Sequence, residues 1–502
     1  MERLPGLNVA NFLEKKALLR AINCVAALSI FFFGYDQGMM GGVNNAKDYI
    51  DLMGFGHVDP ATEEPIITNS LLQGGIVSVY YLGTCRMGYP RAVNGIGTGI
   101  LNAIVPVWAT ETAEHTSRGK FIAIEFTLNI FGVVVAYWLE FGLSFIDHGN
   151  SAVRWRFPIA FQIIPLLVLL ASVWFFPESP RWLIKEGRDE EARYILRRLR
   201  GSAGADAARA EAEYQEIRQV VALETKESQK NSYAHMLFGV GSGKLHTGRR
   251  VQLVIWLQIL QEWVGIAGVT VYAPTIFRIA GYGTTKSQWI SGLNNIFYMF
   301  ATLICVFTLD RIGRRWTLYW GAVGQGAAMF LAGAFSRLGQ QARASGNTSL
   351  AESYGAAAAS FVFIFTSVFG ATWLTVPWLY PAEIFPLQVR AKGNAWGVFG
   401  WSIGNGWLTL LCPVMFGAIG ENTLHIFGAC NVLAIPVVWA LYPESNQRTL
   451  EEMDLLFAAD SPWVWDAERT FARLKQERPE LAHATKADRR VVDPELAVSE
   501  HP

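Results

Sequence analysis

Charge is scarce in this sequence. Only 17% of its 502 residues are Asp, Glu, Lys or Arg, whereas soluble proteins average about 25%. The formal net charge is zero, which gives no reason to expect nucleic acid or another polyanion as a partner. Hydrophobic residues make up 51% of the chain and gather in runs of about 20, the length that crosses a lipid bilayer. The composition therefore predicts an all-α, polytopic membrane protein.

Cysteine is also scarce, and catalytic motifs are missing. The five cysteines show no CxxC spacing and are expected to be small apolar packing residues: Cys24, Cys85, Cys305, Cys412 and Cys430. The sequence contains no zinc-spaced histidine pair, no GxSxG elbow and no P-loop. The glycine-rich GIGTG at 95–99 lies in an apolar run with no strand before it, which argues against a dinucleotide site. We therefore predict no enzyme, no metal site and no cofactor.

The apolar runs predict eleven spans, five before and six after one long charged stretch. They lie near 17–42, 66–84, 92–110, 121–145, 157–176, 251–278, 288–309, 316–336, 355–380, 394–416 and 423–442. The second run is barely long enough to span. Glycines in the third are spaced so that helix backbones could approach closely in lipid.

These runs divide the chain into five parts: an N-terminus (1–16), a first bundle (17–176), a helical linker (177–250), a second bundle (251–442) and a tail (443–502). The tail contains an amphipathic stretch, WVWDAERTFARLKQERPE. Basic residues gather in the N-terminus, the linker and the turns near 310–315 and 390–392, which predicts that both termini are cytoplasmic.

Two features fall on the opposite, outward side in this prediction. Arg154 and Arg156 are exceptions to the basic-residue pattern, because they lie in a loop expected to face outward. The Asn347-Thr348-Ser349 sequon falls in another outer loop, where it could accept a glycan.

Charged motifs recur at the ends of spans. ATETAEHTSRG at 109–119 and PAEIFPLQVR at 381–390 each place a glutamate before a turn and an arginine after it. PESPR at 177–181 and PES at 443–445 end the last span of each half in the same way. DRIGRR at 310–315 could be a positive-inside anchor alone. The repetition nevertheless indicates two related halves, as in transporters built on repeats.

Taken together, these motifs resemble those of the sugar porter family of the major facilitator superfamily, particularly its fungal members. PWLYPAEIFPLQVR at 377–390, PESNQRTLEEMD at 443–454 and RAVNGIGTG at 91–99 add to the resemblance. It implies two bundles of nominally 12 spans, about 11 here, that alternate in exposing a midplane site. It also implies cytoplasmic locks formed by Glu111, Arg118, Glu178, Arg181, Asp310, Arg311, Arg314, Arg315, Glu383, Arg390 and Glu444.

Asp36 is the candidate for proton coupling. It is an acid inside the first span, where an ionisable residue is costly and usually functional. The resemblance pairs it with Arg91, so that protonation of Asp36 would weaken the pair and free this half to move. A structural role at a helix end is the alternative.

The substrate contacts are implied by the same resemblance. Trp378 matches the tryptophan that stacks on the sugar, and Gln261 matches the first of two glutamines. Glu262 stands for the second glutamine, while Asn405 offers a further amide. Phe126, Tyr298 and Ala267 replace amide side chains of the family. Because amides recognise hydroxyl groups, the replacements point toward a polyol or another polyhydroxylated solute as well as a sugar.

The chain departs from the family before residue 91. The turn that should mirror 310–315 and the third span are absent, so eleven spans would invert the downstream part or exclude the short second segment from the membrane. We predict a proton-coupled sugar or polyol transporter of the plasma membrane. A sugar sensor without net transport and a non-functional truncated transporter are the alternatives.

Overall fold

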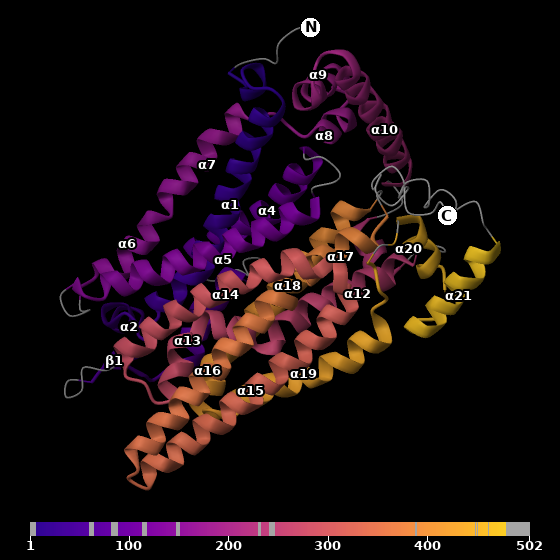
Figure 1. Ribbon diagram of the computed structural model, residues 1–502. Helices are drawn as coiled ribbons and strands as arrows, with labels where there is room; N and C mark the ends of the chain where they lie inside the picture. The colour runs from indigo at the N-terminus through magenta and orange to yellow at the C-terminus, as the bar shows by residue number, and fades with distance from the viewer. Residues whose placement is uncertain are drawn as a thin grey trace, which may run out of the picture.

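The fold is almost entirely helical (Figure 1). The computed structural model describes residues 7–59, 65–81, 89–112, 118–146, 151–228, 232–239, 246–386, 389–446, 448, 450–459 and 461–477. Within these residues the two strands, β1 (Gly56–Val58) and β2 (Pro65–Ile67), form an antiparallel hairpin. Seven helical segments are long and apolar enough to cross a bilayer by length and composition. The predicted all-α, polytopic class is confirmed.

The first half centres on the contact between two long helices. Its elements are η1 (Val9–Asn11), α1 (Lys15–Val43), α2 (Lys47–Met53), α3 (Ser70–Tyr81), α4 (Tyr89–Thr112), α5 (Arg118–Leu143), α6 (Val153–Phe161) and α7 (Ile163–Phe175). A Cβ atom on Gly34 would lie 1.8 Å from the Asn129 carbonyl oxygen, so α1 and α5 touch backbone to backbone. By contrast, Cβ atoms on Gly97 and Gly99 of α4 would meet nothing within 4 Å. The close approach predicted for that glycine run occurs in α1 instead.

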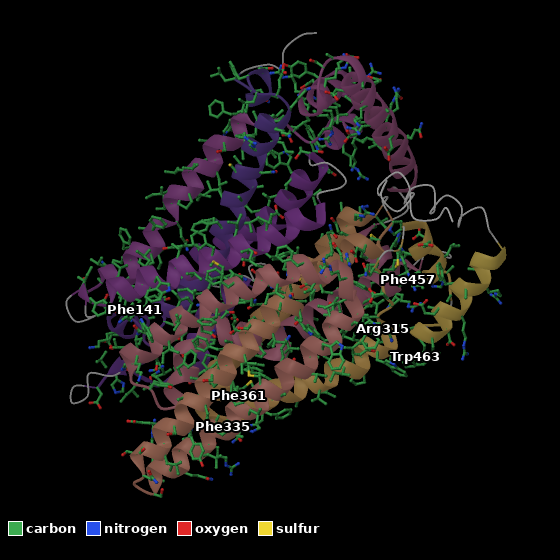
Figure 2. All side chains as sticks on the ribbon, in the orientation of Figure 1. Phe141, Arg315, Phe335, Phe361, Phe457 and Trp463 are labelled. Carbon is green, nitrogen blue, oxygen red and sulfur yellow. The ribbon has the colours of Figure 1, made fainter. Side chains whose placement is uncertain are left out.

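The second half contains longer helices. These are α12 (Thr247–Gln261), η5 (Glu262–Ile266), α13 (Ala267–Ile279), α14 (Thr284–Ile312), α15 (Arg314–Ala344), α16 (Thr348–Thr372), α17 (Val376–Ile384), α18 (Arg390–Ile419) and α19 (Asn422–Leu441). Aromatic side chains interlock them, as where the Phe335 ring on α15 stacks on Phe361 of α16 at 5.6 Å (Figure 2). Asn347 accepts the Leu350 N–H and so caps α16.

A cluster of short helices connects the halves: α8 (Pro180–Lys185), α9 (Asp189–Arg200), α10 (Gly204–Ser228) and α11 (Tyr233–Phe238). Buried Leu183, Ile195 and Tyr214 form its own small core. Lys15 at the start of α1 donates to Asp206 at 2.8 Å and lowers the pKa of that carboxyl. We call the end of the molecule that carries these helices the linker side, and the opposite end the far side.

The tail also lies at the linker side. It consists of α20 (Leu450–Phe457) and α21 (Val464–Glu477), so the amphipathic stretch is helical. Fully buried Arg250, at the start of α12, forms an ion pair with Asp454 at 2.8 Å, and its guanidinium lies over the Phe457 ring. These contacts fix α20 to the second half.

α3 is too short to cross a bilayer. Its 12 residues rise about 18 Å, against about 30 Å of hydrocarbon. A Cβ atom on Gly74 would lie 2.3 Å from the Leu410 carbonyl oxygen, and one on Gly417 would lie 3.5 Å from Ser70 Oγ. α3 therefore starts at the far end of α18 and runs toward its middle.

α4 runs in the same direction as α3. At its C-terminal end the Thr112 carbonyl accepts a hydrogen bond from Arg200 at 3.2 Å, and Trp108 Nε1 donates to the Pro177 carbonyl at 3.1 Å. Besides the seven apolar segments, α4, α14 and α15 are long enough to cross, with 24, 29 and 31 residues. The start of α1 and α20 both lie at the linker side, as the Lys15–Asp206 and Arg250–Asp454 pairs show.

The two arginines that broke the basic-residue pattern lie in α6 and not in an outer loop. Arg154 is buried and faces a small pocket that it shares with Glu140 and Gln288. The Arg156 guanidinium lies 5.0 Å from the centre of the Trp155 ring. Burial of one and stacking of the other explain why both occur on the far side.

We expect Gly34→Val to destabilise the first half. A side chain at this position would push α5 away from α1, and overpacking of this kind costs about 1–3 kcal/mol. Thermal unfolding of the purified protein in detergent measures the effect. Gly97→Val is the matched control, because its Cβ meets nothing within 4 Å. Equal melting temperatures for the two variants would contradict the backbone contact.

Candidate functional site

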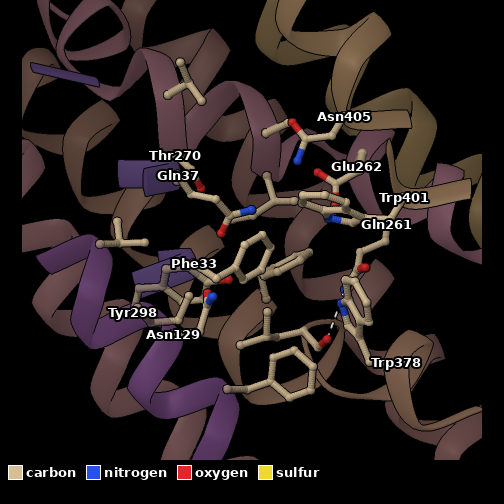
Figure 3. A pocket seen from close by; sticks show the side chains of 18 residues that line it. Phe33, Gln37, Asn129, Gln261, Glu262, Thr270, Tyr298, Trp378, Trp401 and Asn405 are labelled. Atoms are coloured by element: carbon tan, nitrogen blue, oxygen red, sulfur yellow. Dashed lines mark hydrogen bonds between the residues drawn. The ribbon is translucent and has the colours of Figure 1, made fainter. Parts of the chain in front are cut away.

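A cavity lies between the two halves, midway along the helices (Figure 3). α1 and α5 line it from the first half, while α12, η5, α13, α14, α16, α17 and α18 line it from the second. Its empty space is about 540 Å³, open space at its mouth included. All four residues predicted to contact the substrate, Gln261, Glu262, Trp378 and Asn405, line this cavity.

Aromatic rings form one wall. Trp378 lies between Phe126 and Trp401, with ring centres 5.8 Å and 5.9 Å away. Phe33 meets Trp401 edge-on at 5.5 Å. Rings held in this way present a rigid apolar surface, which suits the C–H face of a sugar or polyol. The role assigned to Trp378 stays a prediction, and its position agrees with that role.

Amide groups on the other walls keep free hydrogen-bonding atoms. Gln261 Nε2 donates to the Trp373 and Leu374 carbonyls at 2.8 and 3.0 Å, which fixes the side chain. In the described residues, Gln261 Oε1, Asn405 Oδ1 and Asn129 Nδ2 are buried without a hydrogen-bond partner. Buried polar groups normally have partners, so these three atoms are available for hydroxyl groups of a ligand.

Glu262 begins an irregular turn. It is the first residue of η5, a π-helical turn between α12 and α13, in which Gly265 has φ of +118°. Trp401 donates a hydrogen bond to its carboxylate. The absence of a side chain at Gly404 lets α18 pack on Glu262, since a Cβ there would lie 3.3 Å from Glu262 Cβ. π-helical turns are frequent at functional sites.

The sequence analysis did not identify every lining residue. Phe33, Gln37, Asn129, Thr270 and Trp401 were missed, although all five face the cavity (Figure 3). Helical spacing could have indicated some of these lining residues, because two residues four positions apart on a helix lie on the same face. Phe33 with Gln37, and Trp401 with the predicted Asn405, are such pairs. Phe126, Tyr298 and Ala267, assigned as replacements for amides, do line the cavity.

Asp36 lies next to the cavity residue Gln37 on α1. Its side chain is 1% exposed, and Gln162 Nε2 donates to its Oδ1 at 2.8 Å. Arg91 is the third residue of α4, but its side chain is outside the described residues. The Asp36–Arg91 pair and the coupling role of Asp36 therefore stay predictions.

A dense ion cluster closes the linker side of the second half. Arg314 is bound by Glu383 at 2.6 Å and by Asp310 at 3.0 Å. Asn446 Oδ1 accepts from Arg314 at 2.7 Å, and Ser445 Oγ donates to Glu383 at 2.6 Å. The cluster joins the α14–α15 turn to α17 and to the segment after α19. It brings together residues that the sequence places more than 60 positions apart.

Glu444 caps the helix that follows the same turn. Its two carboxylate oxygens accept the backbone N–H groups of Arg314 and Arg315 at 2.9 and 3.0 Å, at the positive end of the α15 dipole. Arg315 also donates to the Trp439 carbonyl at 2.6 Å. Arg311 is exposed, and Arg390 donates to the Phe385 carbonyl at 3.4 Å. Only part of the predicted lock set thus belongs to the cluster.

The first half has a reduced version of this cluster. The Ser179 hydroxyl donates to Glu111, just as Ser445 donates to Glu383. Arg181 lies 4.0 Å from Glu111, and Glu178 is exposed where Glu444 caps a helix. Arg118 begins α5, but its side chain is outside the described residues. The sequence has no first-half counterpart of the 310–315 turn to supply an arginine like Arg314.

Known proteins match this chain along most of its length. Residues 85–457 match the family model described as "Sugar (and other) transporter". The chain is similar to "Sugar transporter STL1" of Saccharomyces cerevisiae, with 30% identity over 89% of this chain and 83% of the relative. It is 29% identical to "MFS-type transporter oryC" of Aspergillus oryzae, over 88% of this chain and 86% of that one.

Solved structures show the same fold. The structure of the proton:xylose symporter XylE bound to 6-bromo-6-deoxy-D-glucose superposes with a TM-score of 0.65, at 24% identity, over 88% of this chain and all of that one. A partially occluded, inward-open form of the xylose transporter XylE from E. coli gives the same TM-score at 22% identity, over 87% of this chain and all of that one.

We expect Glu383→Gln to destabilise the second half by about 3 kcal/mol, because Arg314 would keep its charge without its buried partner. Asp310→Asn is the matched control: it contacts the same arginine, but 76% of its side chain is exposed, so its effect stays within about 1 kcal/mol. Chemical unfolding of both variants in detergent compares them. An equal loss from the two changes would contradict the role of Glu383 in the cluster.

Proposed function

Because the chain belongs to the sugar porter family of the major facilitator superfamily, we propose that it carries a sugar or a related polyol across the plasma membrane by proton-coupled alternating access. The cavity between the halves carries this proposal. It combines an aromatic wall with buried amide atoms that have no partner, and a polyhydroxylated solute needs both.

Contacts between the halves on the far side support alternating access. Tyr137 of α5 donates to the Thr270 carbonyl of α13 at 2.5 Å. Arg278 of α13 donates to Asn45 after α1 at 3.4 Å. Both bonds would break if the far ends of the bundles separated, while the ion cluster on the linker side lies within the second half. This arrangement suits an inward-facing state, one of the two that the mechanism requires.

The placement of the termini follows from the linker-side contacts described above. The N-terminal segment, the linker and α20 share one side, and basic residues are concentrated there, which supports a cytoplasmic location for both termini. In the alignment with STL1, 500 positions include only 89% of this chain, so the relative has residues where this chain has none. This agrees with a loss of residues in this chain relative to that protein.

The predicted loss of a span has to be weighed against the two alternative functions, an inactive truncated transporter and a sugar sensor. A truncated, inactive transporter would explain the reduced first-half cluster, but the cavity retains residues from both halves. A sensor would bind a solute without moving it. Uptake in yeast cells that lack their own sugar transporters separates these functions: a transporter accumulates labelled D-glucose, D-xylose or sorbitol. Surface expression without uptake of any of them would contradict transport.

We expect Trp378→Ala to raise the KM of uptake about fivefold, since an aromatic contact contributes about 1 kcal/mol and each 1.4 kcal/mol is tenfold. Trp256→Ala is the matched control, because that ring on α12 is exposed and does not line the cavity. A KM that changes equally in both variants would remove Trp378 from the site.

We expect Asp36→Asn to abolish accumulation against a gradient, because the amide cannot exchange a proton, while exchange of solute across the membrane persists. Uptake at a series of external pH values into proteoliposomes measures this. Asp51→Asn, an exposed acid on α2, serves as the control. Accumulation by the Asp36 variant equal to that of the unaltered chain would exclude this residue as the coupling site.

A further inference from the structure

Glu262 is the one acidic side chain among the described residues that line the cavity, and none of them is Asp, Lys, Arg or His. It is 3% exposed, which leaves it almost no contact with bulk water. Its hydrogen-bond donor is the Trp401 indole N–H. An ionised carboxylate at this place would have no counter-charge within the cavity.

Among the side chains that the structure describes, none of the elements packed around Glu262 brings a cation to it either. From α14 the neutral Tyr298 hydroxyl lies near it. On α18 the Cys412 thiol faces Gly268, and on α19 His425 packs against Gly333. The facing helices of the first half carry two acids that adjoin cavity residues in the sequence. Asp36, beside Gln37 on α1, accepts a hydrogen bond from Gln162, and Glu125 lies beside Phe126 on α5. The surroundings of Glu262 within the described residues are neutral or acidic.

The free energy of burial favours the neutral form of such a group. Burial of an unpaired charge costs several kcal/mol, whereas a protonated carboxyl is neutral and gains an O–H donor. We propose that Glu262 is a proton-binding site inside the cavity, and that a neutral polyhydroxylated solute binds the chain in which this carboxyl is protonated. The proposal rests on the function proposed above and adds a proton site distinct from Asp36.

The proton transfer balances without any further reactant. Water delivers one proton to the Glu262 carboxylate from the side to which the cavity is open. The protonated carboxyl then donates its O–H to a hydroxyl oxygen of the solute, while Asn405 Oδ1 and Gln261 Oε1 can accept hydroxyl hydrogens from it. After the cavity opens to the other side, the solute leaves and the proton returns to water.

The position of Glu262 connects this proton to the shape of the helix. η5 interrupts the passage formed by α12 and α13, and Tyr272, six residues beyond the end of η5, also has non-helical torsions of −113° and 23°. Two hydrogen bonds join the halves at the far side, one from Tyr137 to Thr270 and one from Arg278 to Asn45. Both involve α13, which follows this irregular turn in the chain. A change of charge at Glu262 therefore acts where the two parts of the passage meet.

The test is equilibrium binding by the purified full-length protein in detergent. D-glucose, D-xylose and sorbitol are titrated by calorimetry at a series of pH values. The Kd of the unaltered chain should rise with pH, by up to about tenfold per unit, the limit for one linked proton. Glu262→Gln imitates the protonated carboxyl and restores the second glutamine of the family, so its Kd should stay low and independent of pH.

Glu125→Gln is the matched control, because it removes a buried carboxyl that does not line the cavity. It should keep the pH dependence of the unaltered chain. Unchanged pH dependence in the Glu262 variant, or its loss in the Glu125 variant, would overturn the proposal. Binding that varies as described but without uptake in cells would refute transport and leave the proton site standing.

A second measurement needs no solute. The infrared spectrum of the unaltered protein should show a protonated-carboxyl band, at neutral pH, that is absent from the Glu262→Gln variant. Identical spectra would show that Glu262 is ionised in the empty cavity, which contradicts the proposal. If none of the three solutes binds the unaltered chain, the infrared difference alone decides the proton site, while the function proposed above fails by itself.

Discussion

The fold depends on the requirement that charged segments stay outside the hydrocarbon of a bilayer. The charged segments before α1, between the halves and after α19 meet it by lying together at the linker side. The 12 residues of α3 pack beside the part of α18 that is distant from the linker side, and they are too few to cross a bilayer.

The same requirement shapes the interior. Backbone groups are satisfied within helices, so the polar atoms left over belong to side chains, and two groups of them differ in how they are satisfied. On the linker side they neutralise each other in the Arg314 cluster. In the cavity they remain unpaired, and aromatic rings surround them. A polar atom without a partner is costly in the first place and useful in the second, where a solute can supply the missing bonds.

Much of the fold could be predicted from the sequence, because long apolar runs and motifs at their ends have few interpretations. Ten of the eleven predicted runs coincide with helical segments long enough to cross, whereas the run at 66–84 contains the short α3. The paired motifs predicted the relation between Glu111–Ser179 and Glu383–Ser445. The length of α3 could not be predicted from hydropathy. The apolar run begins at Ile66, but Pro65–Ile67 forms strand β2, and the helix starts only at Ser70. The neutral surroundings of Glu262 depend on helices of both halves that meet only in space, whereas helical spacing from the predicted Asn405 recovers its missed neighbour Trp401 on α18.

The contacts at the end of α4 have a consequence for the order of folding. The Thr112 carbonyl, Trp108 and Glu111 are held by Arg200, Pro177 and Ser179, all of which leave the ribosome more than 60 residues later. In a complete first bundle a neighbouring span would receive α4 as soon as it entered the membrane. Here the body of α4 packs on α1 and α3, which precede it, but the contacts at its C-terminal end form only after the linker has been synthesised.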